Sequence, residues 1–225
     1  VLLVLLCFFI VREMSYYQAS ATFLLLLGSN AFMDFSSSGL ENILCAFLLA
    51  LAYFSLQNCL KSPDNNSCRT KALFWLSLLP ICRHDLLSLI LPLAAVFIYF
   101  AYQGKWQRLR ATLLMFLPLA AWSVFSLLYY GALFPNTAYA KLLTGIPRVE
   151  LLGQGFHYIL VTLQQDPASI LLLVAAIFVG FSAGDRLAKA VSAGILLNSC
   201  YIIWAGGDFM RGRFFTSALT LALLL

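Results

Sequence analysis

Charged side chains are scarce in this sequence. Only 10% of its 225 residues are Asp, Glu, Lys or Arg, whereas 62% are hydrophobic, and the mean hydropathy is +0.91. A soluble domain carries about 25% charged residues, and no soluble core of this size buries so much apolar surface. The composition therefore excludes a soluble protein and predicts a chain whose solvent is mostly the lipid bilayer.

Other features are also missing. No basic stretch interleaves with polar surface, and the net charge is only +5, so nucleic acid is not expected as a partner. The six cysteines lack the paired spacing of a zinc site, and no metal or cofactor is expected. The chain begins at Val1 without a signal-peptide n-region and ends within another apolar run. We interpret residues 1–225 as a single transmembrane domain, a fragment without its N-terminal span, first outer loop and C-terminal remainder.

Long apolar runs fill most of the chain. A span needs about 20 apolar residues, or fewer where a helix is cut or ends at a polar cavity. On this basis we predict an all-α, polytopic transmembrane helix bundle of about nine spans, with a short span at 72–82 that stops below the membrane surface. The candidate spans are 1–11, 19–33, 43–58, 72–82, 86–102, 111–130, 168–182, 190–205 and 214–225.

The charges predict the orientation of the spans. Alternate crossings place nine Lys and Arg residues on one side and five on the other, so the first side should be cytoplasmic. Six of the nine acids fall on the opposite, outer side. We therefore expect a multi-pass protein of the bacterial inner membrane whose active face is extracytoplasmic, because charges at a membrane boundary need water or a partner.

The first two outer turns carry acids. In the turn from Asp34 to Asn42, serines 36–38 can cap the following helix with Glu41 in its first turn, or Asp34 and Glu41 can bind a sugar hydroxyl or its proton. The second turn is Arg83-His84-Asp85, where Arg83 and Asp85 can form a simple ion pair. Alternatively, Arg83 binds a phosphate and is oriented by Asp85.

The third outer turn, Tyr129 to Lys141, has the sequence YYGALFPNTAYAK. Its aromatic residues are typical of a membrane-interface belt, but Tyr130, Asn136 and Tyr139 are also common sugar-binding side chains. Lys141 can pair with a phosphate as a point charge.

The fourth outer turn, GGDFMRGRF at 206–214, packs one acid and two arginines into six residues. It forms either a hairpin whose acid and arginines pair with one another or a clamp for a phosphate. In a clamp, Arg211 and Arg213 would hold the phosphate and Asp208 would fix one of them. Because all four motifs fall at outer turns, we expect Asp34, Glu41, Asp85 and Asp208 to converge on one cavity.

The strings YYGALFPNTAYAK and GGDFMRGRF, with SSGLEN at 37–42, resemble polytopic glycosyltransferases of the GT-C superfamily. The resemblance covers roughly residues 30–215 and is closest to the branch with the mycobacterial terminal β-arabinofuranosyltransferase and its uncharacterised bacterial relatives. The Arg83-His84-Asp85 turn departs from the Arg-Pro-Asp-Gly expected of that branch.

The resemblance implies a membrane-bound, inverting hexosyl- or pentosyltransferase. Its donor is a polyprenyl-phosphate sugar, and its acceptor is a glycan, lipid or protein. It also implies carboxylate bases and basic side chains on the donor phosphate, with the family's key acid in a first outer loop that lies upstream of this fragment. The expected catalytic residues are Asp34, Glu41, Asp85 and Asp208, and the expected substrate-binding residues are Arg83, Tyr130, Asn136, Tyr139, Lys141, Arg211 and Arg213.

The main rival interpretation is a multi-span transporter or flippase of a lipid-linked or anionic substrate. Such proteins also place charges among broken helices, but their sites lie near the midplane and their halves are often related by symmetry. This sequence has no repeat, and its polar motifs lie at one boundary. A polysaccharide polymerase or ligase would have related chemistry on a different fold, and a purely structural membrane protein would have no chemistry at all.

Overall fold

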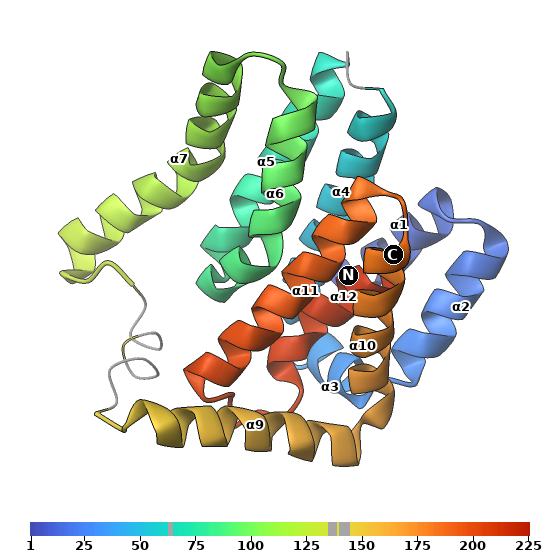
Figure 1. Cartoon of the computed structure of the whole chain (residues 1–225), viewed down its shortest axis with the longest axis vertical. Coiled ribbons are helices and arrows are strands. Elements are labelled where there is room, and N and C mark those ends of the chain that lie inside the picture. Colours follow the sequence, from blue (N-terminus) through green and yellow to red (C-terminus); the bar gives the residue numbers. More distant parts are fainter. Residues whose placement is uncertain (63–64, 135–138, 140–144) are drawn as a thin grey trace.

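The computed structural model describes residues 1–62, 65–134, 139 and 145–225 (Figure 1). Every regular element in these ranges is helical, as the apolar runs predicted. The elements are α1 (Leu2–Glu13), α2 (Tyr16–Leu27), α3 (Asn30–Ser36), α4 (Asn42–Lys61), α5 (Asn66–Cys82), η1 (His84–Leu86), α6 (Leu87–Ala101), α7 (Lys105–Tyr130), α9 (Arg148–Gln165), α10 (Pro167–Ser182), α11 (Arg186–Ala205), η2 (Arg213–Phe215) and α12 (Thr216–Leu224).

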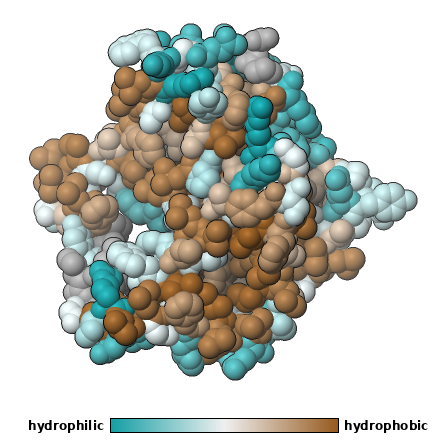
Figure 2. Space-filling model, in the orientation of Figure 1, coloured by the Kyte–Doolittle hydropathy of each residue, from teal (hydrophilic) through white to brown (hydrophobic). Residues whose placement is uncertain are grey.

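Fewer helices than the nine predicted spans are long enough to cross a bilayer. By length and composition, four segments of the described chain qualify, and a fifth qualifies if the bent pair α9–α10 is counted as one span. α1, α2, α10 and α12 have 9 to 16 residues each, below the roughly 20 that a span needs. The four segments are Asn42–Lys61, His84–Ala101, Lys105–Tyr130 and Arg186–Ala205. They give the chain the character of an integral membrane protein, and hydrophobic residues dominate the middle of the face in Figure 2.

The described parts of the four predicted polar turns lie at one end of the bundle, hereafter the α9 end (Figure 1). α4 and α6 start there, α5, α7 and α11 finish there, and α9 crosses it. As a result, residues 34–41, 83–86 and 206–213 meet although they are far apart in sequence. The alternation that assigned these turns to one side of the membrane therefore agrees with the packing of the helices.

Helix α9 was not predicted, because residues 131–167 were interpreted as a long break between spans. The chain bends by 112° between α9 and α10, at Asp166, whose carboxylate accepts hydrogen bonds from the backbone N–H of Ser169 and of Ala31. One stripe of α9 is buried against the bundle, a second is apolar and exposed, and a third is mostly polar. The buried stripe is Leu151, Gly155, Tyr158 and Thr162, the apolar stripe is Val149, Leu152, Phe156, Leu160 and Leu163, and the polar stripe includes Glu150, Gln154 and His157.

The serines of the first turn do not cap α4 as expected. Glu41 is the N-cap residue of that helix, while the hydroxyls of Ser36 and Ser38 donate back to the carbonyls of Met33 and Phe35. The physical reason is that the serines lie before the turn at Gly39, which has φ of +75°, whereas α4 begins after it at Asn42. The serines therefore close α3, and Glu41 is left to make contacts with other helices.

Close helix contacts hold α11 in the middle of the bundle. A Cβ built on Gly155 of α9 would overlap the backbone of Ile203, and one on Gly194 of α11 would overlap the carbonyl of Leu89 in α6. A Cβ on Gly180 of α10 would likewise collide with α11. Small residues let backbones approach closely where the bilayer provides no hydrophobic drive for helix association, so α11 is fixed against three neighbours at once.

Candidate functional site

Five charged side chains from three polar turns form an ion-pair network at the α9 end. They connect in the order Asp85, Arg83, Glu41, Arg213 and Asp208. Three of the four acids that the sequence predicted to converge therefore meet in one ion-pair network, together with two predicted arginines. They do not share one cavity as predicted, because Asp85 and Asp208 line different ones. The fourth acid, Asp34, is exposed on α3 and makes no ion pair within the described part of the chain.

Arg83 is the buried centre of the ion-pair network, with 7% of its surface exposed. Its Nε and Nη2 donate to the two carboxylate oxygens of Asp85 over 3.1 and 2.6 Å, and its Nη1 donates to Oδ1 of Asn42 over 2.6 Å. The guanidinium also lies 5.4 Å from the ring centroid of Phe214. Burial lowers the pKa of Arg83, but Asp85 and Glu41 outweigh burial and raise it above its ordinary value, so the guanidinium stays charged.

Glu41 joins the two arginines. Its Oε1 accepts a hydrogen bond from Nη2 of Arg213 over 2.9 Å and lies 3.8 Å from Nε of Arg83. Burial raises the pKa of Glu41, but backbone hydrogen bonding, Arg213 and Arg83 together lower it below its ordinary value. The carboxylate is therefore ionised near neutral pH, and it is a poor proton acceptor because both arginines stabilise its charge.

Asp208 ends the ion-pair network on the side of the 206–213 turn. Its Oδ2 lies 3.6 Å from Nη1 of Arg213, its Oδ1 accepts from the backbone N–H of Phe209 over 2.8 Å, and its side chain has no exposed surface. Three carboxylates thus surround two guanidiniums in the part of the network that the structure describes. Arg213 is engaged by acids, whereas Arg211 is exposed and makes no ion pair within the described residues.

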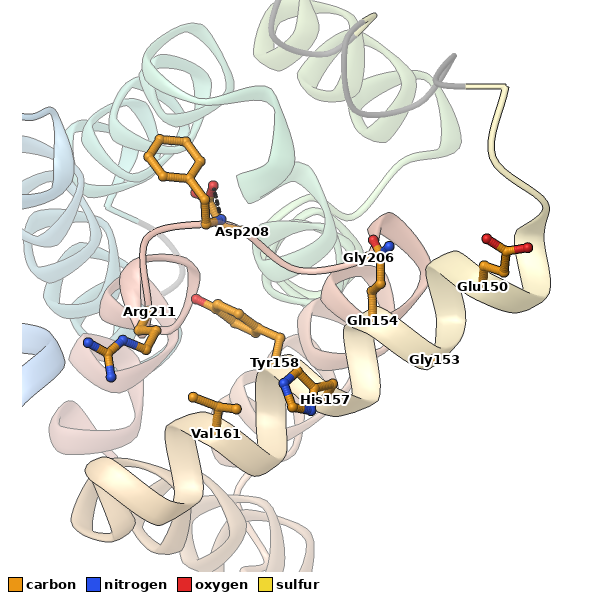
Figure 3. A pocket seen from close by; sticks show the side chains of 10 residues that line it. Glu150, Gly153, Gln154, His157, Tyr158, Val161, Gly206, Asp208 and Arg211 are labelled. Atoms are coloured by element: carbon orange, nitrogen blue, oxygen red, sulfur yellow. Dashed lines mark hydrogen bonds between the residues drawn. The ribbon is translucent and has the colours of Figure 1, made fainter.

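A cavity of about 740 Å³, with both polar and apolar lining, lies between α9 and the 206–211 turn (Figure 3). Asp208 and Arg211 border it on the turn side, and the polar stripe of α9 forms its other wall. The lining residues are Glu150, Gly153, Gln154, His157, Tyr158, Val161, Gly206, Asp208, Phe209 and Arg211. Its wall is fixed at Tyr158, whose hydroxyl donates to the carbonyl of Met210 over 3.3 Å and accepts from the backbone N–H of Phe214 over 3.4 Å.

A second cavity, of about 190 Å³, adjoins the first at Arg211, which lines both. Asp34 lies on its wall, so the predicted acid that stands apart from the ion-pair network still faces the same turn. The other lining residues are Asn30, Ala31, Thr162, Gln165, Asp166 and Gly212. The two cavities together are called the α9 groove below.

An apolar cleft of about 600 Å³ lies between α6, α7 and α11, with His84 and Asp85 on its wall. The Nε2 of His84 has no hydrogen-bond partner among the described residues, and its ring centroid is 6.2 Å from that of Phe134. The other lining residues are Leu87, Ser88, Leu91, Leu119, Ser123, Leu197, Cys200, Tyr201 and Trp204. The cleft meets the ion-pair network at Asp85, and the α9 groove meets it at Asp208.

The remaining predicted residues belong to the third turn. Tyr130 is 65% exposed at the end of α7 and packs edge-on against Tyr129, as an interfacial aromatic pair would. The ring centroid of Tyr139 lies 6.2 Å from that of Phe134. Asn136 and Lys141 lie outside the described residues.

Sequence reasoning missed two side chains that organise the site. The Oδ1 of Asn42 accepts from Arg83 and from the hydroxyl of Thr216, over 2.6 and 3.2 Å, and Tyr158 braces the 206–213 turn. The signal for Asn42 was a polar side chain at the first position of an apolar helix. The signal for Tyr158 was the helical spacing of apolar residues from Val149 to Leu163, which marks α9.

Within the described ranges, no group of three His, Cys, Asp or Glu residues is arranged to hold a metal ion. No protein-family model, curated protein or solved structure matches this chain.

Proposed function

We propose that this chain belongs to a membrane-bound, inverting glycosyltransferase that moves a sugar from a polyprenyl-phosphate donor to a glycan, lipid or protein acceptor at the extracytoplasmic face. One observation carries the proposal: the ion-pair network lies between an apolar cleft and a cavity with both polar and apolar lining. Asp85 borders the apolar cleft and Asp208 borders the α9 groove. An enzyme that joins a lipid-linked substrate to a hydrophilic one needs this arrangement.

The apolar cleft suits the lipid part of the donor. More than half of its lining residues are Leu, Phe, Tyr or Trp. An isoprenoid chain that enters the cleft from the bilayer therefore keeps an apolar environment. Arg211, exposed at the neighbouring turn, is the arginine of this turn that we assign to the donor phosphate. Arg213 has a supporting role, because Glu41 and Asp208 already neutralise it.

The chemistry is a single displacement. The acceptor hydroxyl oxygen forms a bond to the anomeric carbon while the bond from that carbon to the phosphate oxygen breaks. The hydroxyl proton passes to a carboxylate, and polyprenyl phosphate leaves with the bonding electrons. Attack from the face opposite the phosphate inverts the anomeric centre. Asp34, which is exposed on the wall of the groove, is the carboxylate of this chain that we assign to the proton. Asp208, whose side chain is buried, positions Arg213, and the basic side chains stabilise the leaving phosphate.

The test is sugar transfer by the full-length protein. The protein is reconstituted in vesicles with radiolabelled polyprenyl-phosphate sugars and a membrane glycan fraction, and the release of polyprenyl phosphate is measured. Asp34→Asn should lower the rate by about 10²- to 10⁴-fold, the usual contribution of a general base. Asp208→Asn should lower the rate less, because Asp208 acts only through Arg213. Glu13→Gln, a matched change far from the α9 end, should not lower it.

Normal transfer by Asp34→Asn would overturn the assignment of this acid. Movement of a lipid-linked sugar across the vesicle membrane without any transfer would overturn the glycosyltransferase proposal itself. That result would instead favour a flippase, whose substrate could occupy the same apolar cleft.

A further inference from the structure

We infer that the α9 groove binds an elongated, uncharged glycan, which is the acceptor of the reaction. This inference rests on the proposed function and deepens it, because it selects one acceptor class out of glycan, lipid and protein. The observations that carry it are the length of the groove, its hydrogen-bonding side chains, its charge and its exposed aromatic ring.

The groove is long relative to its width. Its lining on α9 runs from Glu150 to Gln165, which is 15 residues, or about 22 Å at 1.5 Å per residue. Arg211 lines both cavities, so they adjoin at this side chain. Such a shape accommodates an extended chain rather than a single small molecule, and the chain would pass Asp208 on its way.

The side chains along the groove can hydrogen-bond in both directions. Gln154, Gln165 and Asn30 carry amides that donate and accept, His157 carries an imidazole, and Glu150 accepts. Hydroxyl groups, which also donate and accept, are the natural complement of such a surface. A lipid acceptor would leave these polar groups without partners, and unmet hydrogen bonds are costly.

The charge of the groove disfavours a polyanion. Four of the lining residues are acids, namely Glu150, Asp34, Asp166 and Asp208, and Arg211 is the one arginine among them. Glu150 and Asp34 are exposed, so the accessible carboxylates outnumber the guanidinium even though Asp166 and the Asp208 side chain are buried. Like charges placed against each other at a binding surface reduce affinity and select against the wrong partner. Phosphate-rich or uronic-acid chains are therefore poor ligands, and neutral sugars are preferred.

An aromatic ring stands at the edge of the groove. Phe209 is 83% exposed, although it is a large apolar side chain at a polar turn. The apolar face of a sugar ring can pack on such a ring, and this burial compensates for the exposure of Phe209 in the free protein. Tyr158 is buried behind the wall of the groove and is held in place from its hydroxyl end (Figure 3).

The groove is formed before any ligand arrives. A Cβ on Gly207 would lie 2.7 Å from Cβ of Tyr158, so the turn packs directly onto α9, and Gly207 has φ of +76°. Gly155 brings the other side of α9 equally close to the backbone of α11. A preformed groove binds without the cost of ordering its walls.

The experiment measures glycan binding without donor. Full-length protein in lipid nanodiscs is titrated with neutral linear hexasaccharides of manno, gluco and arabino configuration, and with the hexamer of galacturonic acid as the polyanion, by saturation-transfer NMR. We expect at least one neutral hexasaccharide to bind at least tenfold more tightly than the polyanion. Gln154→Ala should weaken its binding about three- to tenfold, the effect of one lost hydrogen bond.

The matched control is Gln103→Ala, the same change at an exposed site at the opposite end of the bundle, which should leave binding unchanged. Equal or tighter binding of the polyanion, no binding of any neutral hexasaccharide, or no effect of Gln154→Ala would each overturn the inference. Release of polyprenyl phosphate with water as acceptor tests the proposed function separately, because that reaction does not need the groove to be occupied.

Discussion

Replacing Arg83 tests whether the ion-pair network holds the α9 end together. Arg83 donates two hydrogen bonds to Asp85 and one to Asn42, and its side chain is 6% exposed. Arg83→Ala leaves the Asp85 carboxylate, 16% exposed, without a cation. Breaking a buried pair by removing one partner costs about 3–5 kcal/mol. For a protein of this size that corresponds to a fall in Tm of about 6–20 °C.

The assay is thermal unfolding of the full-length protein in detergent, with intrinsic fluorescence as the probe. Arg110→Ala, an exposed arginine at the opposite end, is the control, and its Tm should change little because surface substitutions are usually within about 0.5 kcal/mol. The double variant Arg83→Met with Asp85→Leu removes both charges at once and should recover much of the loss. The reasoning is refuted if Arg83→Ala leaves Tm within about 1 °C of the unmodified protein, or if the double variant is as unstable as the single one.

Three further outcomes follow from the structure. The pKa of Glu41 is depressed below its ordinary value of 4.5. Its ion pairs therefore stabilise the protein fully above pH 4.5 and lose this effect as pH falls through the lower pKa of the folded state. The Tm difference between the unmodified protein and Glu41→Gln should shrink below about pH 4.5, and a constant difference would contradict this. Gly155→Ala should displace α9 and cost about 1–3 kcal/mol by overpacking, seen as a lower Tm, and an unchanged Tm would mean that α9 is not packed as described. In whole cells that carry the protein without its native reactive cysteines, Ser37→Cys should react with an impermeant maleimide and Ser67→Cys should not. The reverse labelling pattern would mean that the proposed orientation is inverted.

The helical fold could be predicted from the apolar runs. That the polar turns meet at one end of the bundle could be predicted because successive spans alternate in direction across the membrane. Each long run gave a helix near its predicted place, because residues that must satisfy their backbone within a bilayer form helices. The number of spans was harder to predict, because run length does not reveal where a helix bends. Asp166 illustrates this: it separates α9 from α10 with a 112° bend, and the sequence around it shows only a capping residue followed by a proline.

The partners within the site were the least predictable part. The sequence indicated that Arg83 would pair with Asp85, which are two residues apart, and the structure contains that pair. It could not indicate that Glu41 would pair with Arg213, 172 residues away, because that contact depends on how α4 and η2 pack. Nor could it separate the roles of Arg211 and Arg213, which are two residues apart, yet one is exposed and the other faces two acids.

The apolar cleft has one wall that is held firmly and one that is not. α11 is locked against α6, α9 and α10 through contacts in which a glycine meets a neighbouring backbone or side chain. α7, by contrast, packs chiefly on α5, and only 17% of its most apolar stretch is buried inside the molecule. A bulky lipid that pushed into the cleft would therefore displace α7 sideways within the plane of the bilayer. The site could exchange a lipid directly with the surrounding membrane while its charged side chains stayed in place.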